Sequence, residues 1–276
     1  MKSYFKIQKY REVIMKWLWV SSVFVFVFIL GLSGTSRAQT ASSASDVRLD
    51  YVRNQLLAGG FNQAQVGNLL TDSRIQLLPK ISVAYKPANW TAVAKRMYSK
   101  TSVQAGVNYI KSNQAIFDDT QKYYGVPSGV IAGIMAIETN FGSNVGSYPV
   151  FNALYSRMEH WPASSWQYQA GELVAFSKYC LNANFDCLQL KGSYAGAIGL
   201  VQFMPDSILA YGVDGDKDGV VDLLNAADAV PSAANFLIRH GWFVNKLKAL
   251  GSYYGSPVGY PSIVLTYSTL VAKGLK

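Results

Sequence analysis

The sequence has weak and short strand signals, no internal repeat of useful length and no low-complexity tract after residue 46. These absences exclude repeat architectures and argue against a large sheet. Only two cysteines are present, and 25 Lys and Arg residues stand against 16 acidic ones. The sequence shows no basic patch of the kind that nucleic-acid binding requires, so we expect no nucleic acid as a partner.

The N-terminal segment is basic and then apolar. Five Lys and Arg residues precede an apolar run at residues 17–32, and the small-x-small pattern Ser36-Arg37-Ala38 follows it. This layout predicts a secretory signal peptide over residues 1–38. At 16 residues the run also allows a retained membrane anchor. No cysteine follows the run directly, which argues against lipid attachment there, and Met15 offers a second start.

The remaining chain is moderately basic. Residues 1–38 carry +5 of the formal net charge of +9, which leaves about +4. That charge favours an acidic polymer or a membrane surface as partner. Residues 39–46 (QTASSASD) are small and polar and predict a disordered lead-in, so we place the folded domain at residues 47–276.

Apolar residues recur at helical spacing through most of this domain. Two helices separated by Gly59-Gly60 are predicted over residues 47–78, and residues 91–123 are again helical in pattern. Further helices are predicted near residues 129–139, 169–181 and 229–240. The fold class is therefore mainly α, with at most a small sheet.

Cys180 and Cys187 lie seven residues apart. In an exported protein such a pair can close a short loop as a disulfide. The alternative is two small buried hydrophobic side chains.

Glu138 is the only charged residue in the apolar stretch IAGIMAIETNFG. Ile131, Ile134 and Met135 precede it on the same helical face, so its carboxyl should emerge beside an apolar wall. Desolvation and the negative end of the helix dipole both raise the pKa of such a carboxyl. A carboxylic acid that stays protonated near neutral pH can serve as a general acid. The alternatives are an exposed last turn, or a buried carboxylate paired with Arg157 or a backbone amide.

The segment GSYAGAIGLVQFMP at residues 192–205 combines closely spaced glycines with hydroxyl and amide side chains. Glycines allow a close approach of backbone or ligand, and Ser193, Tyr194 and Gln202 suit the hydroxyl groups of a sugar. Tight helix packing is the alternative interpretation.

The acidic loop DGDKDGVVDLLNAAD begins like an EF-hand. Asp214, Asp216 and Asp218 occupy positions 1, 3 and 5, and the Val220 carbonyl is at position 7. Position 12 is Asn225 instead of the usual Glu. We interpret the loop as a stabilising Ca²⁺ site, with a solvated acidic turn as the alternative.

In order along the chain, YGVPSGVIAGIMAIETNFG, LKGSYAGAIGLVQFMPDS and the acidic loop resemble the membrane-bound lytic murein transglycosylase B family of bacterial peptidoglycan-cleaving enzymes. The likeness runs from about Leu49 to the last helix. It implies a lysozyme-like fold with a helical domain, a core domain and a small domain with little β-sheet. It also implies an enzyme that acts on the glycan strands of peptidoglycan. From the signal peptide we expect a periplasmic location, and we expect a monomer with other cell-wall proteins as further partners.

The resemblance implies roles for single residues. Glu138 matches the catalytic glutamate, which protonates the glycosidic oxygen and then takes the proton of the muramic C6 hydroxyl, so that a 1,6-anhydro end forms. Ser193 and Gln202 match positions that line the saccharide site, and Asp228 matches the acid that closes the calcium loop. One carboxylate suffices in this reaction, whereas hydrolases usually need two. A hydrolytic muramidase and a non-catalytic peptidoglycan-binding scaffold are the alternatives.

The chain departs from the family pattern at three places. Val93 stands where the family commonly has Tyr, and Ser164 and Ser165 replace its paired arginines. Its C-terminal Tyr-Asn pair reads Tyr267-Ser268, so Tyr267 is a weak candidate for contacting the substrate.

Overall fold

The computed structural model describes residues 44–79, 81, 88–255 and 258–276. All of them belong to one compact unit, Ser42–Lys276. The predicted signal peptide and residues 39–43 lie outside the described residues. Within the described residues, every helix is too short or too polar to cross a bilayer.

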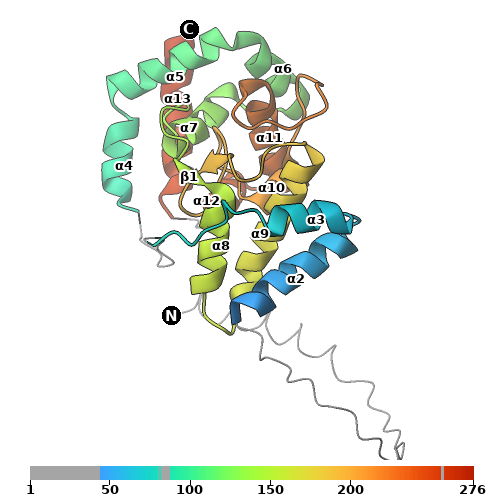
Figure 1. The fold of residues 1–276 in the computed structure, drawn as a ribbon. Helices are drawn as coiled ribbons and strands as arrows, with labels where there is room; N and C mark the ends of the chain where they lie inside the picture. Colours follow the sequence, from blue (N-terminus) through green and yellow to red (C-terminus); the bar gives the residue numbers. More distant parts are fainter. Residues whose placement is uncertain (1–43, 80, 82–87, 256–257) are drawn as a thin grey trace, which may run out of the picture. The chain divides into compact units, whose positions relative to one another are not determined.

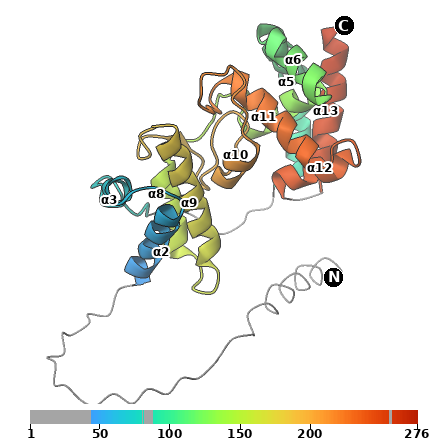
Figure 2. The same cartoon turned by 90° about the vertical axis from the view of Figure 1, so that its right-hand side faces the viewer.

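Four helices form one packed group around the longest of them. Helix α9 packs against α8 and α2, and α2 packs against α3 (Figures 1 and 2). The side chains of Val52 and Leu56 on α2 are fully buried in this group. These helices are α2 (Ala44–Ala58), α3 (Gln63–Leu70), α8 (Val150–His160) and α9 (Trp166–Asn182).

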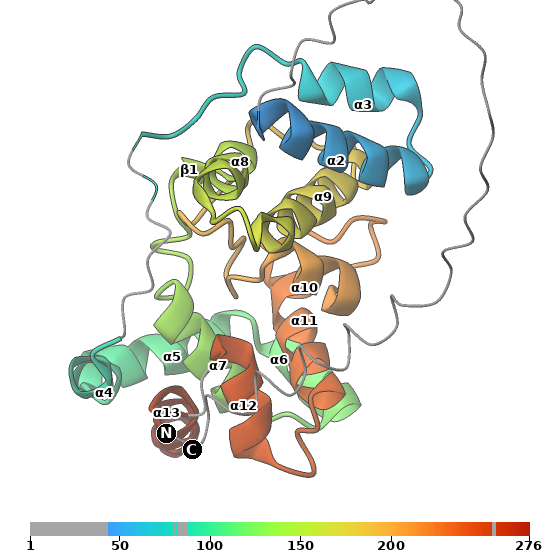
Figure 3. The ribbon, with the colours of Figure 1, turned by 90° about the horizontal axis from the view of Figure 1, so that it is seen from below.

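The second group is centred on α7, which packs against α5 and α13 (Figure 3). Helix α10 (Pro205–Tyr211) joins the two groups, because it contacts α9 of the first and α11 of the second. The second group contains α4 (Trp90–Met97), α5 (Lys100–Ser112), α6 (Gln114–Tyr124), α7 (Ser128–Glu138), α11 (Ala226–Arg239), α12 (Lys246–Tyr254) and α13 (Tyr260–Leu275).

Helix α7 is buried along almost its whole length, from Gly129 to Ala136. Its two glycines explain how it fits. A Cβ at Gly129 would lie 2.8 Å from the Ser268 hydroxyl oxygen, and one at Gly133 would lie 3.2 Å from Val264. The backbones of α7 and α13 therefore approach closely, and the helix that carries Glu138 is held rigidly in the core.

The sheet consists of two short strands. Strand β1 (Tyr148–Pro149) pairs antiparallel with β2 (Lys191–Gly192), with Tyr148 opposite Gly192. The predicted mainly helical fold with little sheet is confirmed.

Several predicted boundaries differ from the observed ones. Residues 91–123 form three helices, because the Ser99 hydroxyl accepts a hydrogen bond from the Ser102 amide and starts a new helix, and a second break falls at Asn113. Helix α3 ends at Leu70, eight residues before the predicted end. Helix α2 begins at Ala44, inside the predicted lead-in, because small residues such as alanine also favour helices.

Candidate active site

Glu138 is the last residue of α7, and its side chain is half-buried. Burial raises the pKa of this carboxyl from 4.5 to about 7, and a nearby Tyr260 hydroxyl lowers it by a smaller amount. No carboxyl group of the described residues contributes to the shift. Arg157 does not pair with Glu138; it donates a hydrogen bond to Gln169 and lies over the Trp161 ring. Glu138 is therefore a protonatable acid near neutral pH, and no carboxylate in the described part of the chain is paired with it.

Tyrosine side chains from α12 and α13 lie around this carboxyl. Tyr253 and Tyr260 both have pKa values well above the usual range, because they are buried and close to Glu138. The Tyr253 hydroxyl donates to the Val201 carbonyl at 2.8 Å. The buried Tyr260 hydroxyl has no acceptor at hydrogen-bonding geometry among the described residues, although it is near enough to affect the Glu138 pKa.

Trp90 on α4 packs against this group of tyrosine side chains. Its ring contacts Tyr254 edge-on at 4.9 Å, and Tyr254 stacks on Tyr260 at 5.2 Å. The turn before α13 needs glycine, because a Cβ at Gly259 would lie 2.2 Å from the Trp90 ring.

Tyr253, Tyr254 and Tyr260 are not among the residues that the sequence predicts for the site. The stretch YYGSPVGY carries a signal that could have found them, since three tyrosines occur there within eight residues beside two glycines. Tyr267 was predicted instead, and the structure does not bring it to the site. Its side chain is fully buried, and its hydroxyl donates to the Ser102 carbonyl at 2.6 Å, where a ligand has no access.

The turn after α7 has an unusual backbone. Asn140 and Phe141 have φ values of 50° and 57°, and Gly142 follows at 86°. Left-handed φ is unfavourable for residues with a Cβ, so the turn must be held from outside. Phe141 stacks on Tyr109 with ring centroids 4.9 Å apart, and the Thr139 hydroxyl donates to the Leu200 carbonyl. The stack ties the turn to α5, and the hydrogen bond joins the Glu138 end of α7 to the glycine-rich segment.

The glycine-rich segment is shaped by its own hydrogen bonds. The Ser193 hydroxyl oxygen accepts from the amides of Ala195 and Ala197, and the Gln202 amide group donates to the carbonyls of Gly199 and Val145. The predicted residues Ser193 and Gln202 thus lie on one folded loop tied to α7. Glycine is needed at Gly199, where a Cβ would lie 2.4 Å from the Leu223 carbonyl oxygen.

Tyr194 projects from the same loop and is 45% exposed. It lies near enough to Arg157 to interact with its charge. An exposed ring beside a guanidinium is suited to contact a sugar face or an anionic substituent.

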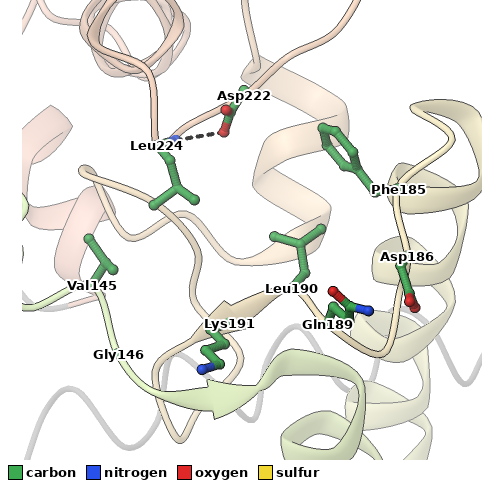
Figure 4. Close-up of a pocket in the computed structure, with 9 residues that line it drawn as sticks. All are labelled: Val145, Gly146, Phe185, Asp186, Gln189, Leu190, Lys191, Asp222 and Leu224. Atoms are coloured by element: carbon green, nitrogen blue, oxygen red, sulfur yellow. Dashed lines mark hydrogen bonds between the residues drawn. The ribbon is translucent and has the colours of Figure 1, made fainter.

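A pocket of about 490 Å³ adjoins this loop without including Glu138. Figure 4 shows lining side chains from the segment before β1, from β2 and from the acidic loop. It connects to the site through Val145, whose carbonyl accepts the Gln202 bond. Its lining residues are Val145, Gly146, Phe185, Asp186, Gln189, Leu190, Lys191, Asp222 and Leu224.

Glu172 on α9 is the second carboxyl with a pKa raised to about 7, first by burial and then by the nearby Asp206 carboxylate. Its side chain is almost fully buried and accepts a hydrogen bond from the Asp206 amide at 3.2 Å, in the first turn of α10. Glu172 is therefore enclosed and already bonded, whereas Glu138 is partly open.

The acidic loop brings three of the predicted ligands together. Asp214, Asp216 and Asp228 each place a carboxylate oxygen within 4.8 Å of the others. Asp228 is buried and accepts hydrogen bonds from the amides of Gly215 and Asp222, which orients its carboxylate. Three converging carboxylates suit Ca²⁺, which prefers hard oxygen ligands. Asp218 is not in this group; its carboxylate accepts from the Val220 amide.

Cys180 and Cys187 form a disulfide with their Cα atoms 5.5 Å apart. The loop that it closes carries Asp186, whose carboxylate pairs with Arg74 at 2.7 Å. The disulfide thus constrains the loop after α9, and this loop contacts the segment after α3.

Comparisons with known proteins agree with this architecture. A family model described as a transglycosylase SLT domain matches residues 44–250. The membrane-bound lytic murein transglycosylase B of Escherichia coli (strain K12) is 33% identical over 233 residues, which make up 78% of this chain and 63% of the relative. The chain therefore spans less than two thirds of that relative's length.

Solved structures share the fold. Soluble lytic transglycosylase SltB1 from Pseudomonas aeruginosa superposes with a TM-score of 0.74 at 23% identity, over 83% of this chain and 99% of that chain. The Escherichia coli lytic transglycosylase Slt35 in complex with calcium gives 0.72 at 22% identity, over 83% of this chain and 93% of that one. The predicted lysozyme-like fold is thereby confirmed. Because the family model covers most of its residues, this chain belongs to the transglycosylase SLT domain family.

Proposed function

We propose that this protein is a lytic transglycosylase of peptidoglycan. It cleaves the β-1,4 bond between N-acetylmuramic acid and N-acetylglucosamine and leaves a 1,6-anhydromuramic end. The observation that carries the proposal is Glu138, a desolvated carboxyl with a pKa of about 7 and no carboxylate partner among the described residues.

Glu138 acts twice in the proposed reaction. Its protonated carboxyl gives a proton to the leaving glycosidic oxygen as the bond to C1 breaks. The resulting carboxylate then accepts the proton of the C6 hydroxyl, whose oxygen attacks C1 of the same sugar. A retaining hydrolase needs a second carboxylate as nucleophile. Here the substrate's own hydroxyl replaces it, which fits a site with one titrating carboxyl.

Other residues of the site bind and position the sugar in this proposal. Ser193, Tyr194 and Gln202 line the saccharide site from the glycine-rich loop. Tyr253 and Tyr260 contribute to the apolar surroundings of the Glu138 carboxyl, because both are buried and close to it. Tyr267 supports the fold only.

The acidic loop holds a structural Ca²⁺ ion in this proposal. Asp214, Asp216 and Asp228 supply carboxylate oxygens, and Asp218 and the Val220 carbonyl are the further predicted ligands. The ion stabilises the chain between α10 and α11 and has no part in the bond cleavage. Support comes from the convergence of three carboxylates and from the calcium-bound relative.

We further propose that residues 1–38 export the protein to the periplasm and that residues 47–276 are the catalytic region, acting as a monomer on glycan strands. Other proteins of the cell-wall machinery are its expected partners.

The decisive experiment digests purified peptidoglycan with the wild-type protein, Glu138→Gln and Glu172→Gln, followed by mass spectrometry of the products. Wild type and Glu172→Gln should release fragments with anhydro ends, and Glu138→Gln should lose at least about 100-fold in rate. Glu172→Gln is the matched control, because it removes a carboxyl of similar pKa from an enclosed position. Reducing ends would establish a hydrolytic muramidase instead. Unchanged products from Glu138→Gln would remove the catalytic assignment.

A further inference from the structure

An exposed apolar surface lies away from the catalytic residues, where the end of α6 meets the loop between α11 and α12. Tyr123 is 82% exposed, Phe243 71%, Val244 92% and Leu247 53%. The two segments are in contact, since a Cβ at Gly125 would lie 2.8 Å from the Phe243 ring. Apolar side chains gathered at this exposure usually mark an interaction site.

Lysines accompany these apolar side chains. Lys246 and Lys248 flank Leu247 and are exposed, and Lys122 precedes Tyr123. We call the four apolar residues and these three lysines the apolar–lysine patch. Asp118 and Asp119 lie one turn earlier on α6 and limit the patch on that side.

The charge of this part of the chain is of one sign. Residues 229–276 contain five Lys and Arg residues and no Asp or Glu. Aromatic and aliphatic side chains interspersed with lysines are typical of surfaces that lie at the boundary of a bilayer, where the apolar groups enter and the ammonium groups meet lipid phosphates. A second copy of the chain is a poor occupant, because its lysines would face those of the first.

We propose that the apolar–lysine patch docks the protein onto the surface of an anionic phospholipid membrane. The patch is at the Gly125 end of α7, and Glu138 is at the other end of this 11-residue helix, about 16 Å away. The bound protein therefore keeps its site free for a polymer outside the membrane. The inference concerns binding and is independent of the reaction at Glu138.

The test is co-sedimentation of residues 42–276 with vesicles. This fragment contains every described helix within one compact unit and lacks the apolar run at residues 17–32. Vesicles of phosphatidylcholine mixed with phosphatidylglycerol are compared with pure phosphatidylcholine. Wild type should bind the anionic vesicles, and binding should weaken as salt is added.

Two patch variants and one control make the result specific. Phe243→Ser/Val244→Ser should reduce binding by about tenfold or more, and Lys246→Glu/Lys248→Glu should abolish the preference for anionic lipid. If the double variant loses its helical circular dichroism signal, the single variant Val244→Ser is tested in its place. The control Leu77→Ser/Leu209→Ser removes two half-exposed leucines outside the patch and should bind like wild type.

The proposal is overturned if wild type binds neither vesicle, if it binds both equally, or if the patch variants bind as well as wild type. A dimer in sedimentation velocity that Val244→Ser abolishes, without vesicle binding, would identify the patch as a contact between copies.

Discussion

The Thr139 hydroxyl donates a hydrogen bond to the Leu200 carbonyl at 2.8 Å and accepts one from the Gly142 amide at 3.0 Å. A single side chain thus connects the residue after Glu138 both to its own turn and to the glycine-rich loop. Because Thr139 is almost fully buried, water cannot readily replace either bond.

Thr139→Val should therefore destabilise the protein by about 1–3 kcal/mol, since valine has nearly the same shape as threonine but lacks the hydroxyl. It should also lower kcat/KM, because the turn with two left-handed non-glycine residues loses its external support. Urea denaturation and peptidoglycan digestion measure the two effects. Thr139→Ser keeps the hydroxyl and should retain most of both. Equal stability of Thr139→Val and wild type would contradict the role given to this contact.

The raised pKa of Glu138 makes stability depend on pH. The folded state binds its proton more tightly than the unfolded state, so the neutral carboxyl favours folding at low pH. That contribution should be fully present below pH 4.5 and lost as pH rises through about 7, with a total of about 2–3 kcal/mol.

Urea denaturation of wild type and Glu138→Gln at several pH values isolates this effect, because the glutamine cannot titrate. The free energy of unfolding of wild type should fall relative to the variant between pH 5 and pH 8. A difference that stays constant over this range would show that the carboxyl is solvated. Activity of wild type should fall over the same range, since the reaction needs the acid form.

Tyr260→Phe should raise the pKa of Glu138, because the Tyr260 hydroxyl lowers it. The pH at which activity is half lost should then shift upward. Stability should fall by no more than about 0.5 kcal/mol, since the buried hydroxyl has no hydrogen-bond partner among the described residues.

Tyr253→Phe is the matched comparison, on the other tyrosine beside Glu138. It loses the bond to the Val201 carbonyl and should cost about 1 kcal/mol. Finding the larger loss of stability in Tyr260→Phe would reverse the roles assigned to the two hydroxyls.

Calcium should stabilise the protein without affecting the chemistry. At about 100 times the dissociation constant it should raise Tm by roughly 5–10 °C, and chelation should reverse the change. Asp216→Asn should abolish the response, because this exposed carboxylate belongs to the converging group. Asp118→Asn, an exposed aspartate on α6, should respond like wild type. A calcium-independent Tm in wild type would exclude the site.

The sequence allowed prediction of those parts that depend on local pattern. Burial of α7 followed from an apolar run, and the position of Glu138 at its end followed from helical spacing. The glycines of the loop at residues 192–199 indicated a close backbone approach, and the structure has it at Gly199. Each of these features is encoded within a few neighbouring residues.

The parts that could not be predicted depend on contacts between distant segments. Tyr253 and Tyr260 reach Glu138 across more than 110 residues of sequence. Tyr267 is also a tyrosine of α13, but its hydroxyl reaches the Ser102 carbonyl of α5 instead. Only the packing of α13 against α7, and of α12 against α13, distinguishes these tyrosines. The division of residues 91–123 into three helices depends on caps at Ser99 and Asn113, which compete locally with a continuous helix.

The disulfide between Cys180 and Cys187 makes the stability of the folded chain depend on the redox state of its compartment. Closing a loop of this size restricts the unfolded chain by about 2–3 kcal/mol, and that contribution is absent while both thiols are reduced. Asp186 in the same loop forms an ion pair with Arg74. Reduction of the disulfide should therefore also weaken the contact with the segment after α3. In a reducing cytosol the chain is therefore less stable, and more readily degraded, than after its disulfide has formed. Under the proposed export and the proposed activity on the cell wall, formation of the disulfide would couple full stability of the enzyme to its departure from the cytosol.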